Sequence, residues 1–197
     1  MGGARSRQTD YEGPVDTVYL GCWRKECFTR YGYFDEELVR NQDDELNLRM
    51  RQAGAVVWQS AKIRSWYSCR ESLRKLFAQY LQYGYWKVLV LRKHGRVASW
   101  RQLAPAVALA AFLLLSTLAV TLPWAKMAWT VAVVAYASVL VMAAATAGRG
   151  HSLAIVAAMP LAFATIHAAY AFGYVRGLID FYLIKRGHAK ALAVLTR

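Results

Sequence analysis

Long apolar segments occupy the C-terminal half of the chain, and they constrain its fold more than any other feature. They cover residues 103–122, 127–147 and 153–175. A helix of about 20 residues, at about 1.5 Å rise per residue, crosses a hydrocarbon core of about 30 Å. We therefore expect residues 102–197 to form a transmembrane region of two to three helices that ends in a basic tail.

The distribution of charge supports this division into a polar half and a membrane half. The chain is 57% hydrophobic, yet nearly all of its acidic residues lie before residue 102. Its net charge of +13 would indicate nucleic acid in a soluble protein, but many of the basic residues flank apolar segments. In that position anionic lipid headgroups are the expected partner, so we predict membrane lipids and no nucleic acid.

The basic residues also predict the orientation of the chain. A basic collar of Arg92, Lys93, Arg96 and Arg101 precedes the first apolar segment, and the positive-inside rule places it and the polar half in the cytoplasm. Three full crossings would then put the basic tail outside, against the same rule. Either the third segment does not cross fully or the tail lies on the outer surface, and we favour a segment kinked at Pro160. The tail contains Arg176, Lys185, Arg186, Lys190 and Arg197.

Two further features have plain structural explanations. His167 lies in the third apolar segment, where we expect it to form a hydrogen bond to a neighbouring helix. Cys22, Cys27 and Cys69 are odd in number, without a Cys-x-x-Cys pair and without a histidine at metal-ligand spacing. We expect reduced structural thiols on the cytoplasmic side and no metal site within this chain.

The polar half is expected to combine short strands with helices. Residues that favour strands predict one over 15–19, ending at Gly21, and another over 55–59. A helix begins after Gly21, a turn with two aromatic residues covers 31–38, and a further extended stretch covers 63–69.

The stretch from Asn41 to Gly54 is an amphipathic helix signal with capping residues at both ends. Three consecutive acids, at positions 43–45, lie in the first turn, where they complement the positive end of the helix dipole. Arg49 and Arg51 lie near the other end, and Gly54 can supply a left-handed cap. A solvated surface helix would show the same features, so they alone predict a helix and no chemistry.

A second helix begins at Ser72 and carries aromatic and basic residues together. Tyrosine and tryptophan side chains favour headgroup depth in a membrane, while arginine and lysine reach lipid phosphates. We therefore interpret residues 70–101 as a basic aromatic interfacial helix and linker. Its apolar and aromatic faces contain Leu73, Leu76, Phe77, Tyr80, Leu81, Tyr83 and Trp86.

These motifs follow one another in a definite order. Val15–Gly21 and the Arg24-Lys25 pair are followed by the glycine-aromatic-Asp-Glu segment 31–36, then by the acidic helix 42–54 and the basic aromatic helix. This series resembles the C-terminal half of a family 2 glycosyltransferase, especially the membrane-anchored bacterial enzymes of exopolysaccharide synthesis such as succinoglycan glucosyltransferases. The resemblance covers residues 1–101 by motif and the apolar tail by architecture.

The resemblance implies an α/β fold, a glycosyltransferase A-type, Rossmann-like domain with a nucleotide-sugar at the C-terminal edge of its sheet. Residues 1–69 would form the C-terminal half of that domain. It also implies inverting sugar transfer from a nucleotide-sugar donor to a lipid-linked saccharide acceptor. The protein would lie in the bacterial inner membrane as a multi-pass protein with its catalytic part in the cytoplasm.

The resemblance further assigns roles to individual residues. Asp43 occupies the position of the family's general base, with Gln42 where many members have glutamate. A carboxylate there can accept the proton of the acceptor hydroxyl as an oxocarbenium-like centre develops, and a helix N-terminus favours its ionised form. Gly21 corresponds to an active-site glycine turn. The expected contacts to acceptor or phosphate are Asp44, Arg70, Arg74, Gln79 and Trp86.

Two neighbours of these residues refine the expectation. Asp44 and Glu45 point away from Asp43 by about 100° per helical residue, so we also expect them to support it or to pair with basic residues. Residues 79–86 are only loosely similar to the Gln-x-x-Arg-Trp motif of processive enzymes. The missing arginine favours the addition of a single sugar.

The sequence contains no Asp-x-Asp motif. In this family that motif holds Mg²⁺ or Mn²⁺ against the donor diphosphate, so the ion is expected in a full-length enzyme and its ligands are absent from this chain. We therefore interpret the chain as a C-terminal fragment that is inactive alone. The alternative is a non-enzymatic polytopic membrane adaptor in an envelope assembly complex, which explains the apolar segments but not the ordered motifs.

Overall fold

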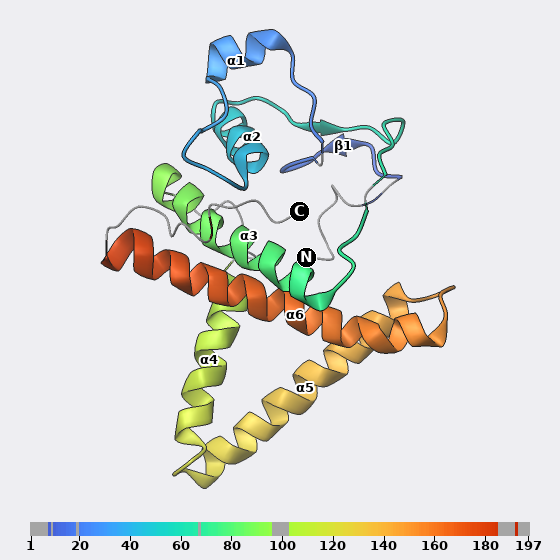
Figure 1. Cartoon of the computed structure of the whole chain (residues 1–197), viewed down its shortest axis with the longest axis vertical. Coiled ribbons are helices and arrows are strands. Elements are labelled where there is room, and N and C mark those ends of the chain that lie inside the picture. The colour runs from blue at the N-terminus through green and yellow to red at the C-terminus, as the bar shows by residue number, and fades with distance from the viewer. Residues whose placement is uncertain are drawn as a thin grey trace.

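The computed structural model describes residues 8, 10–18, 20–66, 68–95, 103–184 and 192. Its described parts are a small polar head, a long central helix, and three apolar helices on the far side of that helix from the head (Figure 1). Several predicted features lie outside the described residues: Tyr19, Tyr67, the collar residues Arg96 and Arg101, and the tail residues Lys185, Arg186, Lys190 and Arg197.

The head contains two helices and a minimal antiparallel sheet. Strand β1 (Gly13–Pro14) pairs with β2 (Trp58–Gln59), and the backbone N–H of Val15 donates to the carbonyl of Val57 at 2.9 Å. Strand β2 lies within the predicted range, whereas β1 precedes its predicted range and no strand is assigned within 63–66 or 68–69.

The predicted Rossmann-like sheet is not present in the described part of the chain. Both strands there are two residues long and antiparallel, whereas a parallel sheet needs crossover connections between longer buried strands. The head offers no buried apolar run of that length, because polar residues and turns separate its few buried side chains.

Helix α1 (Lys25–Tyr31) begins later than predicted, and α2 (Gln42–Gln52) matches the prediction closely. Asn41 enters α2 in the left-handed region at φ 65°, which asparagine tolerates better than most residues. The acids 43–45 lie in the first turn, and Gly54 takes the left-handed conformation at φ 85° just beyond the C-terminal end. The charge pattern and the glycine stop of α2 are thereby confirmed.

Helix α3 (Leu73–His94) is the predicted basic aromatic helix. The Ser72 hydroxyl accepts a hydrogen bond from the backbone N–H of Lys75 at 3.2 Å, which caps its first turn. Gly95, at φ 61°, ends it in the left-handed conformation. Residues 84–91 in its second half are buried, including Tyr85 and Trp86, and form most of the core.

The apolar half forms α4 (Ala104–Leu118), α5 (Pro123–Ala147), α6 (Leu153–Leu178) and the π-helical turn η3 (Ile179–Leu183). The turn between the first two apolar segments occupies 119–122, and Pro123 begins α5; proline is favoured at a first helical position. Helix α6 continues through Pro160, so the proline does not end the helix.

Helix α5 and the segment Leu153–Leu183 are long and apolar enough to cross a membrane, and only 11% of each apolar window is buried. Such exposed apolar helices indicate membrane association. As predicted, His167 on α6 bonds to a neighbouring helix: its Nδ1 lies 3.0 Å from the Tyr136 hydroxyl on α5.

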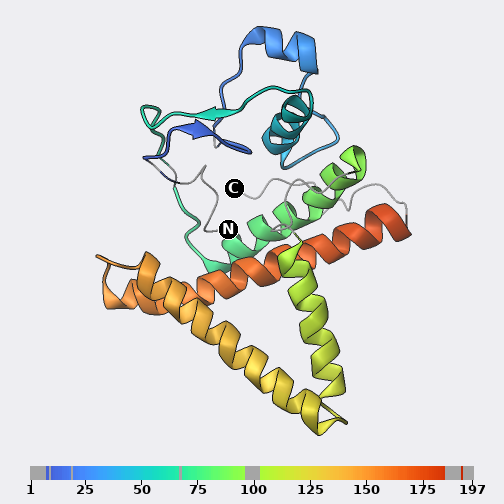
Figure 2. The ribbon, with the colours of Figure 1, turned by 180° about the vertical axis from the view of Figure 1, so that it is seen from behind.

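Figures 1 and 2 show the arrangement from opposite sides. Helices α3 and α6 lie side by side, and α4 and α5 extend away from them to meet at the turn 119–122. The head lies across α3 on the opposite side from α4 and α5. Helix α3 therefore separates the polar head from the apolar helices.

Candidate active site

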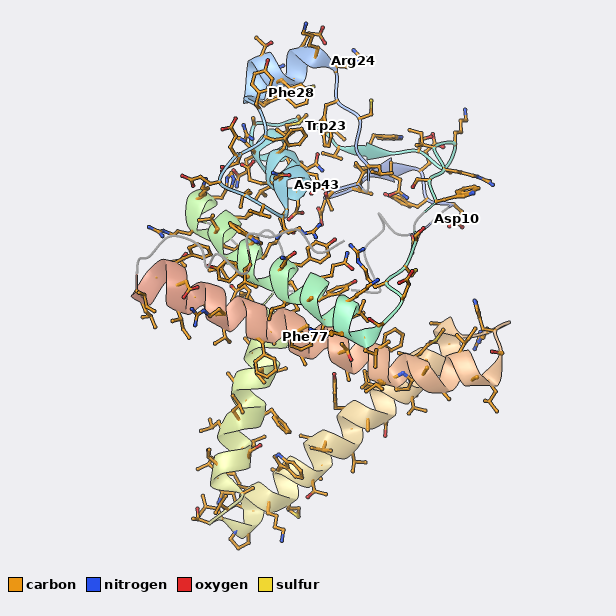
Figure 3. The ribbon with its side chains drawn as sticks, in the orientation of Figure 1. Asp10, Trp23, Arg24, Phe28, Asp43 and Phe77 are labelled. Carbon is orange, nitrogen blue, oxygen red and sulfur yellow. The ribbon has the colours of Figure 1, made fainter. Side chains whose placement is uncertain are left out.

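The N-terminal end of α2 lies against the middle of α3, and this contact positions the candidate active site (Figure 3). The Asn41 side-chain amide donates to the backbone carbonyl of Tyr83 at 3.1 Å. One turn further along α3, the Lys87 ammonium forms an ion pair with Asp44, and the Lys87 side chain is only 7% exposed. The first turn of α2 is therefore fixed on α3 by polar contacts.

The three consecutive acids have different environments. Asp44 is paired with Lys87. Glu45 is buried, pairs with Arg49 at 2.9 Å, and lies 2.8 Å from Nε2 of His94 at the end of α3. Asp43 forms no ion pair with any residue that the structure describes. The prediction that Asp44 and Glu45 pair with basic residues is confirmed.

Asp43 is a partly buried carboxylate at the start of α2. The backbone N–H of Asp44 donates to its Oδ1 at 2.9 Å. Desolvation raises the pKa of Asp43 above its ordinary value and repulsion by Asp44 adds to this, while backbone N–H groups and Lys87 oppose the rise without cancelling it. The pKa is thus raised where a helix N-terminus alone would lower it, because burial outweighs the backbone N–H groups. A carboxylate with a raised pKa is the stronger proton acceptor once ionised.

The glycine-aromatic turn is joined to α2 through Arg49. Its guanidinium donates to the carbonyl oxygens of Tyr31 and of Tyr33, the latter at 2.8 Å. Between them Gly32 has φ 84°, and a Cβ there would lie 2.7 Å from Nη1 of Arg49. Only glycine fits this combination of left-handed backbone and close approach. The glycine-aromatic turn and the acidic helix are thus parts of one contact.

The predicted glycine turn at Gly21 is joined to the same helix by Trp23, whose ring lies against Gly21. The indole N–H of Trp23 donates to Oδ1 of Asn47 at 3.2 Å, and the Asn47 amide donates to the Thr17 hydroxyl at 3.0 Å. Because Asn47 is fully buried, these hydrogen bonds satisfy an otherwise costly amide. Gly21 therefore helps to position α2 through the Trp23 ring that packs against it. Figure 3 shows Trp23 close to α2.

The predicted acceptor contacts at Arg70 and Gln79 lie along one face of α3. Nε of Arg70 donates to Oε1 of Gln79 at 3.1 Å, and Nε2 of Gln79 donates to the Tyr83 hydroxyl at 2.9 Å. This chain of hydrogen bonds ends beneath Asn41. Gln79 itself is buried, so its role in the structure is to hold Arg70 and Tyr83.

The other two predicted contacts lie elsewhere. Arg74 is exposed in the first turn of α3. Trp86 is fully buried, and its indole N–H donates to the backbone carbonyl of Leu192 at 3.0 Å. The expectation that Trp86 touches an acceptor is corrected accordingly, because its large apolar ring fills the core of the helix contact instead.

Sequence reasoning missed two residues of this site. Lys87 lies on the predicted interfacial helix, where it is buried as the partner of Asp44. Arg40 lies just before α2, where its Nε donates to Oε1 of Gln82 at 3.1 Å and its guanidinium lies 5.9 Å from the Tyr83 ring centroid. The sequence signal for Lys87 is a lysine within a run of otherwise apolar residues on α3. No sequence signal marks Arg40.

A divalent cation does not fit the acids of this site. Asp44 and Glu45 are already paired with Lys87, Arg49 and His94, and no group of three or more metal-ligating side chains occurs among the described residues. The head also has a shallow hollow of about 290 Å³. It adjoins Arg51, at the other end of α2 from Asp43, so it is separate from the candidate active site. Its lining is Pro14, Val15, Asp16, Arg51, Ala55, Val56 and Val57.

Comparison with known proteins gives one informative similarity. No protein-family model and no solved structure match the chain. The chain is similar to the succinoglycan biosynthesis protein ExoA of Rhizobium meliloti (strain 1021), at 33% identity over 163 residues. These residues cover 80% of this chain and 46% of the relative, so the chain spans less than half of the relative's length. Since 163 residues exceed the polar half, the similarity extends into the apolar helices.

Proposed function

We propose that this chain carries the acceptor side of an inverting family 2 glycosyltransferase that acts in exopolysaccharide or cell-envelope glycan synthesis. The similarity to a succinoglycan biosynthesis protein over both halves of the chain supports this pathway. One structural observation carries the chemistry: among three consecutive acids, Asp43 alone lacks an ion pair within the described residues, and its pKa is raised.

In the proposed reaction Asp43 acts as the general base. Its ionised carboxylate accepts the proton of an acceptor hydroxyl while that oxygen attacks the anomeric carbon of a nucleotide-sugar. The bond to the nucleoside diphosphate breaks on the opposite face, so the configuration inverts. The Asp44–Lys87 ion pair and the Asn41–Tyr83 hydrogen bond hold Asp43 in place on α3.

The acceptor in this proposal is a saccharide linked to a membrane lipid through phosphate. Arg40 and Arg70 are both joined to Tyr83 or its neighbours, below the first turn of α2. Guanidinium groups bind phosphate oxygens in pairs of hydrogen bonds, so two arginines that contact the same stretch of α3 suit a diphosphate. We place the catalytic part on the cytoplasmic face of the bacterial inner membrane, where nucleotide-sugars are available.

The donor site belongs to a part of the enzyme that this chain does not cover. The relative is more than twice as long as the matched segment, and this sequence contains no Asp-x-Asp motif. We place the nucleotide and its Mg²⁺ or Mn²⁺ in that other part. The ion would stabilise the leaving diphosphate there, and every residue role proposed for this chain concerns the acceptor.

The test is sugar transfer by membranes that contain the full-length protein, assayed with a panel of radiolabelled nucleotide-sugars. Asp43→Asn should lower transfer by about 10²-fold to 10⁴-fold, because a positioned base contributes that much. It should not lower the melting temperature, since it removes a desolvated charge from a partly buried position. Asp10→Asn, an exposed acid of the head far from Asp43, is the matched control (Figure 3). Wild-type turnover by Asp43→Asn would refute the assignment.

A further inference from the structure

Helix α6 is long enough to cross a membrane, but its second half is packed against α3 by direct backbone contact. A Cβ at Gly84 of α3 would collide with the carbonyl oxygen of Tyr170, and a Cβ at Gly173 of α6 would collide with that of Leu81. A Cβ at Gly177 would lie 2.8 Å from the carbonyl oxygen of Tyr85. Glycines at both positions of this Gly-x-x-x-Gly pair allow two helices to touch along their backbones.

Polar contacts at the end of α6 fix it further. The Tyr85 hydroxyl donates to Oδ2 of Asp180 at 3.1 Å, and Asp180 is itself buried. The Arg92 guanidinium donates to the backbone carbonyl of Phe181 at 2.8 Å. Both α3 residues thereby reach η3, and the segment from Gly173 to Phe181 follows α3 along its length.

Helix α3 cannot lie in hydrocarbon, because its other face carries the polar head. Its Lys87 is ion-paired to Asp44, its Gln82 accepts from Arg40, and its Lys93 pairs with Glu37 at 2.6 Å. Burying the head's charges in a bilayer core would cost far more than the contact supplies. The second half of α6 must therefore lie at the same level as α3, outside the hydrocarbon core.

The α4–α5 hairpin has the charge pattern of the crossing element. The 25 residues of the obliquely running α5 span about 37 Å, enough for a core of about 30 Å, whereas the 15 residues of α4 span about 22 Å and reach that thickness only with the apolar turn 119–122. Exposed Trp124 lies near the hairpin tip, as is usual at an interface, and Lys126 is the single basic residue between 103 and 148. By contrast, Arg149 and Arg176 lie near the ends of α6.

We propose that α4 and α5 are the two membrane crossings, and that α6 lies in the plane of the leaflet beneath the head. Its partner is the anionic lipid surface of that leaflet: Arg149 meets headgroup phosphates, and so does Arg176, whose Nε pairs with Asp180 at 3.1 Å while its side chain stays 55% exposed. Exposed apolar residues such as Leu161 and Phe172 meet the acyl chains below. The chain then leaves α6 on the side of the head, and the positive-inside rule is satisfied without a third crossing.

This arrangement would hold the α2–α3 contact at a fixed height above the lipid. Packed helix axes lie about 8–10 Å apart, so the first turn of α2 stands on α3, and α3 lies beside α6 at headgroup level. The inference depends only on packing and charge, and it remains open to test whatever reaction the head performs.

Cysteine accessibility tests the proposal in the full-length protein in native membranes. In a background that retains Cys22 of the head and replaces Cys27 and Cys69 with serine, Ile184→Cys and Lys126→Cys are added one at a time. A membrane-impermeant maleimide should label Cys22 and the Ile184→Cys variant from the same face, and the Lys126→Cys position from the other. Labelling of the Ile184→Cys position from the face opposite Cys22 would show that α6 crosses, and labelling of the Lys126→Cys position from the face of Cys22 would show that the hairpin does not. Either result overturns the proposal.

Depth measurements test the position of α6 itself. A fluorophore attached to Ile155→Cys, Leu161→Cys or Phe172→Cys, in vesicles of phosphatidylethanolamine and phosphatidylglycerol, is quenched by spin labels at known depths. An in-plane helix gives three similar shallow depths. A crossing helix would separate the first and second positions by about 9 Å and the second and third by about 16 Å along its axis, which would refute the proposal. Arg149→Gln with Arg176→Gln should reduce the added binding to phosphatidylglycerol vesicles over neutral ones, and unchanged binding would exclude these arginines as the anionic-lipid contacts.

Discussion

Helix α3 makes two contacts of opposite character. Toward the head, side chains meet through charge: Lys87 pairs with Asp44, and His94 lies 2.8 Å from Glu45. Toward α6, the backbones meet directly across glycines. A pair of opposite charges fixes one register between two elements, but its attraction must offset the cost of removing both charges from water. Close packing of apolar atoms gains dispersion energy without that desolvation cost. Changes of side-chain charge should therefore destabilise the contact with the head more, and changes of side-chain volume should destabilise the contact with α6 more.

The largest expected effect is on the α6 contact. Gly173→Leu places a branched side chain where even a Cβ would collide with the backbone of α3, and backbone cannot move as a side chain can. The free energy of unfolding in detergent should fall by about 3 kcal/mol or more, at the upper end for overpacking. Denaturant titration of the purified protein measures the change.

Val175→Leu is the control for this prediction. Val175 lies two residues further along α6 and is exposed, so added volume there should change stability by less than about 0.5 kcal/mol. Equal losses for the two variants would mean that the glycine contact does not hold α6 to α3.

A smaller effect is expected on the head contact. Lys87→Met leaves the Asp44 carboxylate without its partner at a site where Lys87 is 7% exposed and Asp44 is 27% exposed. Removing one partner of a buried pair costs about 3–5 kcal/mol, and the partial exposure of Asp44 reduces this to about 2 kcal/mol. The same titration measures it.

The loss of stability in Lys87→Met should come from the unpaired charge and not from the change in side-chain volume. Adding Asp44→Asn to Lys87→Met removes the unpaired charge, and most of the stability should return. Lys75→Met, an exposed lysine on the same helix, is the control and should have little effect. A double variant as unstable as Lys87→Met alone would contradict the assignment of this contact to charge.

The helices beside the site could be predicted because their signals are local. The acids, the arginines and Gly54 define α2, and Ser72 defines the start of α3. Hydrogen bonds and dipole interactions within a few residues produce these signals, so no tertiary structure is needed to read them. The role of Asp43 as a general base rests instead on the family resemblance and stays a prediction.

Other features depend on contacts between distant residues. The sequence could not show that Lys87 pairs with Asp44, because 43 residues separate them. Proline usually ends or kinks a helix, yet α6 continues through Pro160. The pKa of Asp43 reversed its expected direction because burial by the surrounding fold outweighed the local dipole. The Rossmann-like sheet was expected from the family resemblance and not from a run of buried strand residues, and the described residues do not form it.

The smallest expected effect concerns the edge of the head contact, where Lys93 at the end of α3 pairs with Asp35 and Glu37. Burial raises the pKa of Asp35, but the hydrogen bonds from Lys93 and from the Glu37 backbone outweigh it and leave the pKa lowered from 3.8. Burial likewise lowers the pKa of Lys93, and its two acidic partners raise it overall above 10.5. Both side chains are partly exposed, so solvent weakens the pair.

Lys93→Met should therefore cost less than about 1 kcal/mol at neutral pH, and the cost should depend on pH. A carboxyl whose pKa is lowered on folding contributes its full stability above its unfolded value of 3.8, and this contribution is lost as pH falls through the lowered pKa. The difference between wild type and Lys93→Met should thus be constant from pH 5 to pH 8 and disappear in strong acid. Melting temperatures across this range measure it, with Lys62→Met, an exposed lysine of the head, as the control. A difference that persists below the pKa of Asp35 would mean that Lys93 acts through packing, as the α6 contact does.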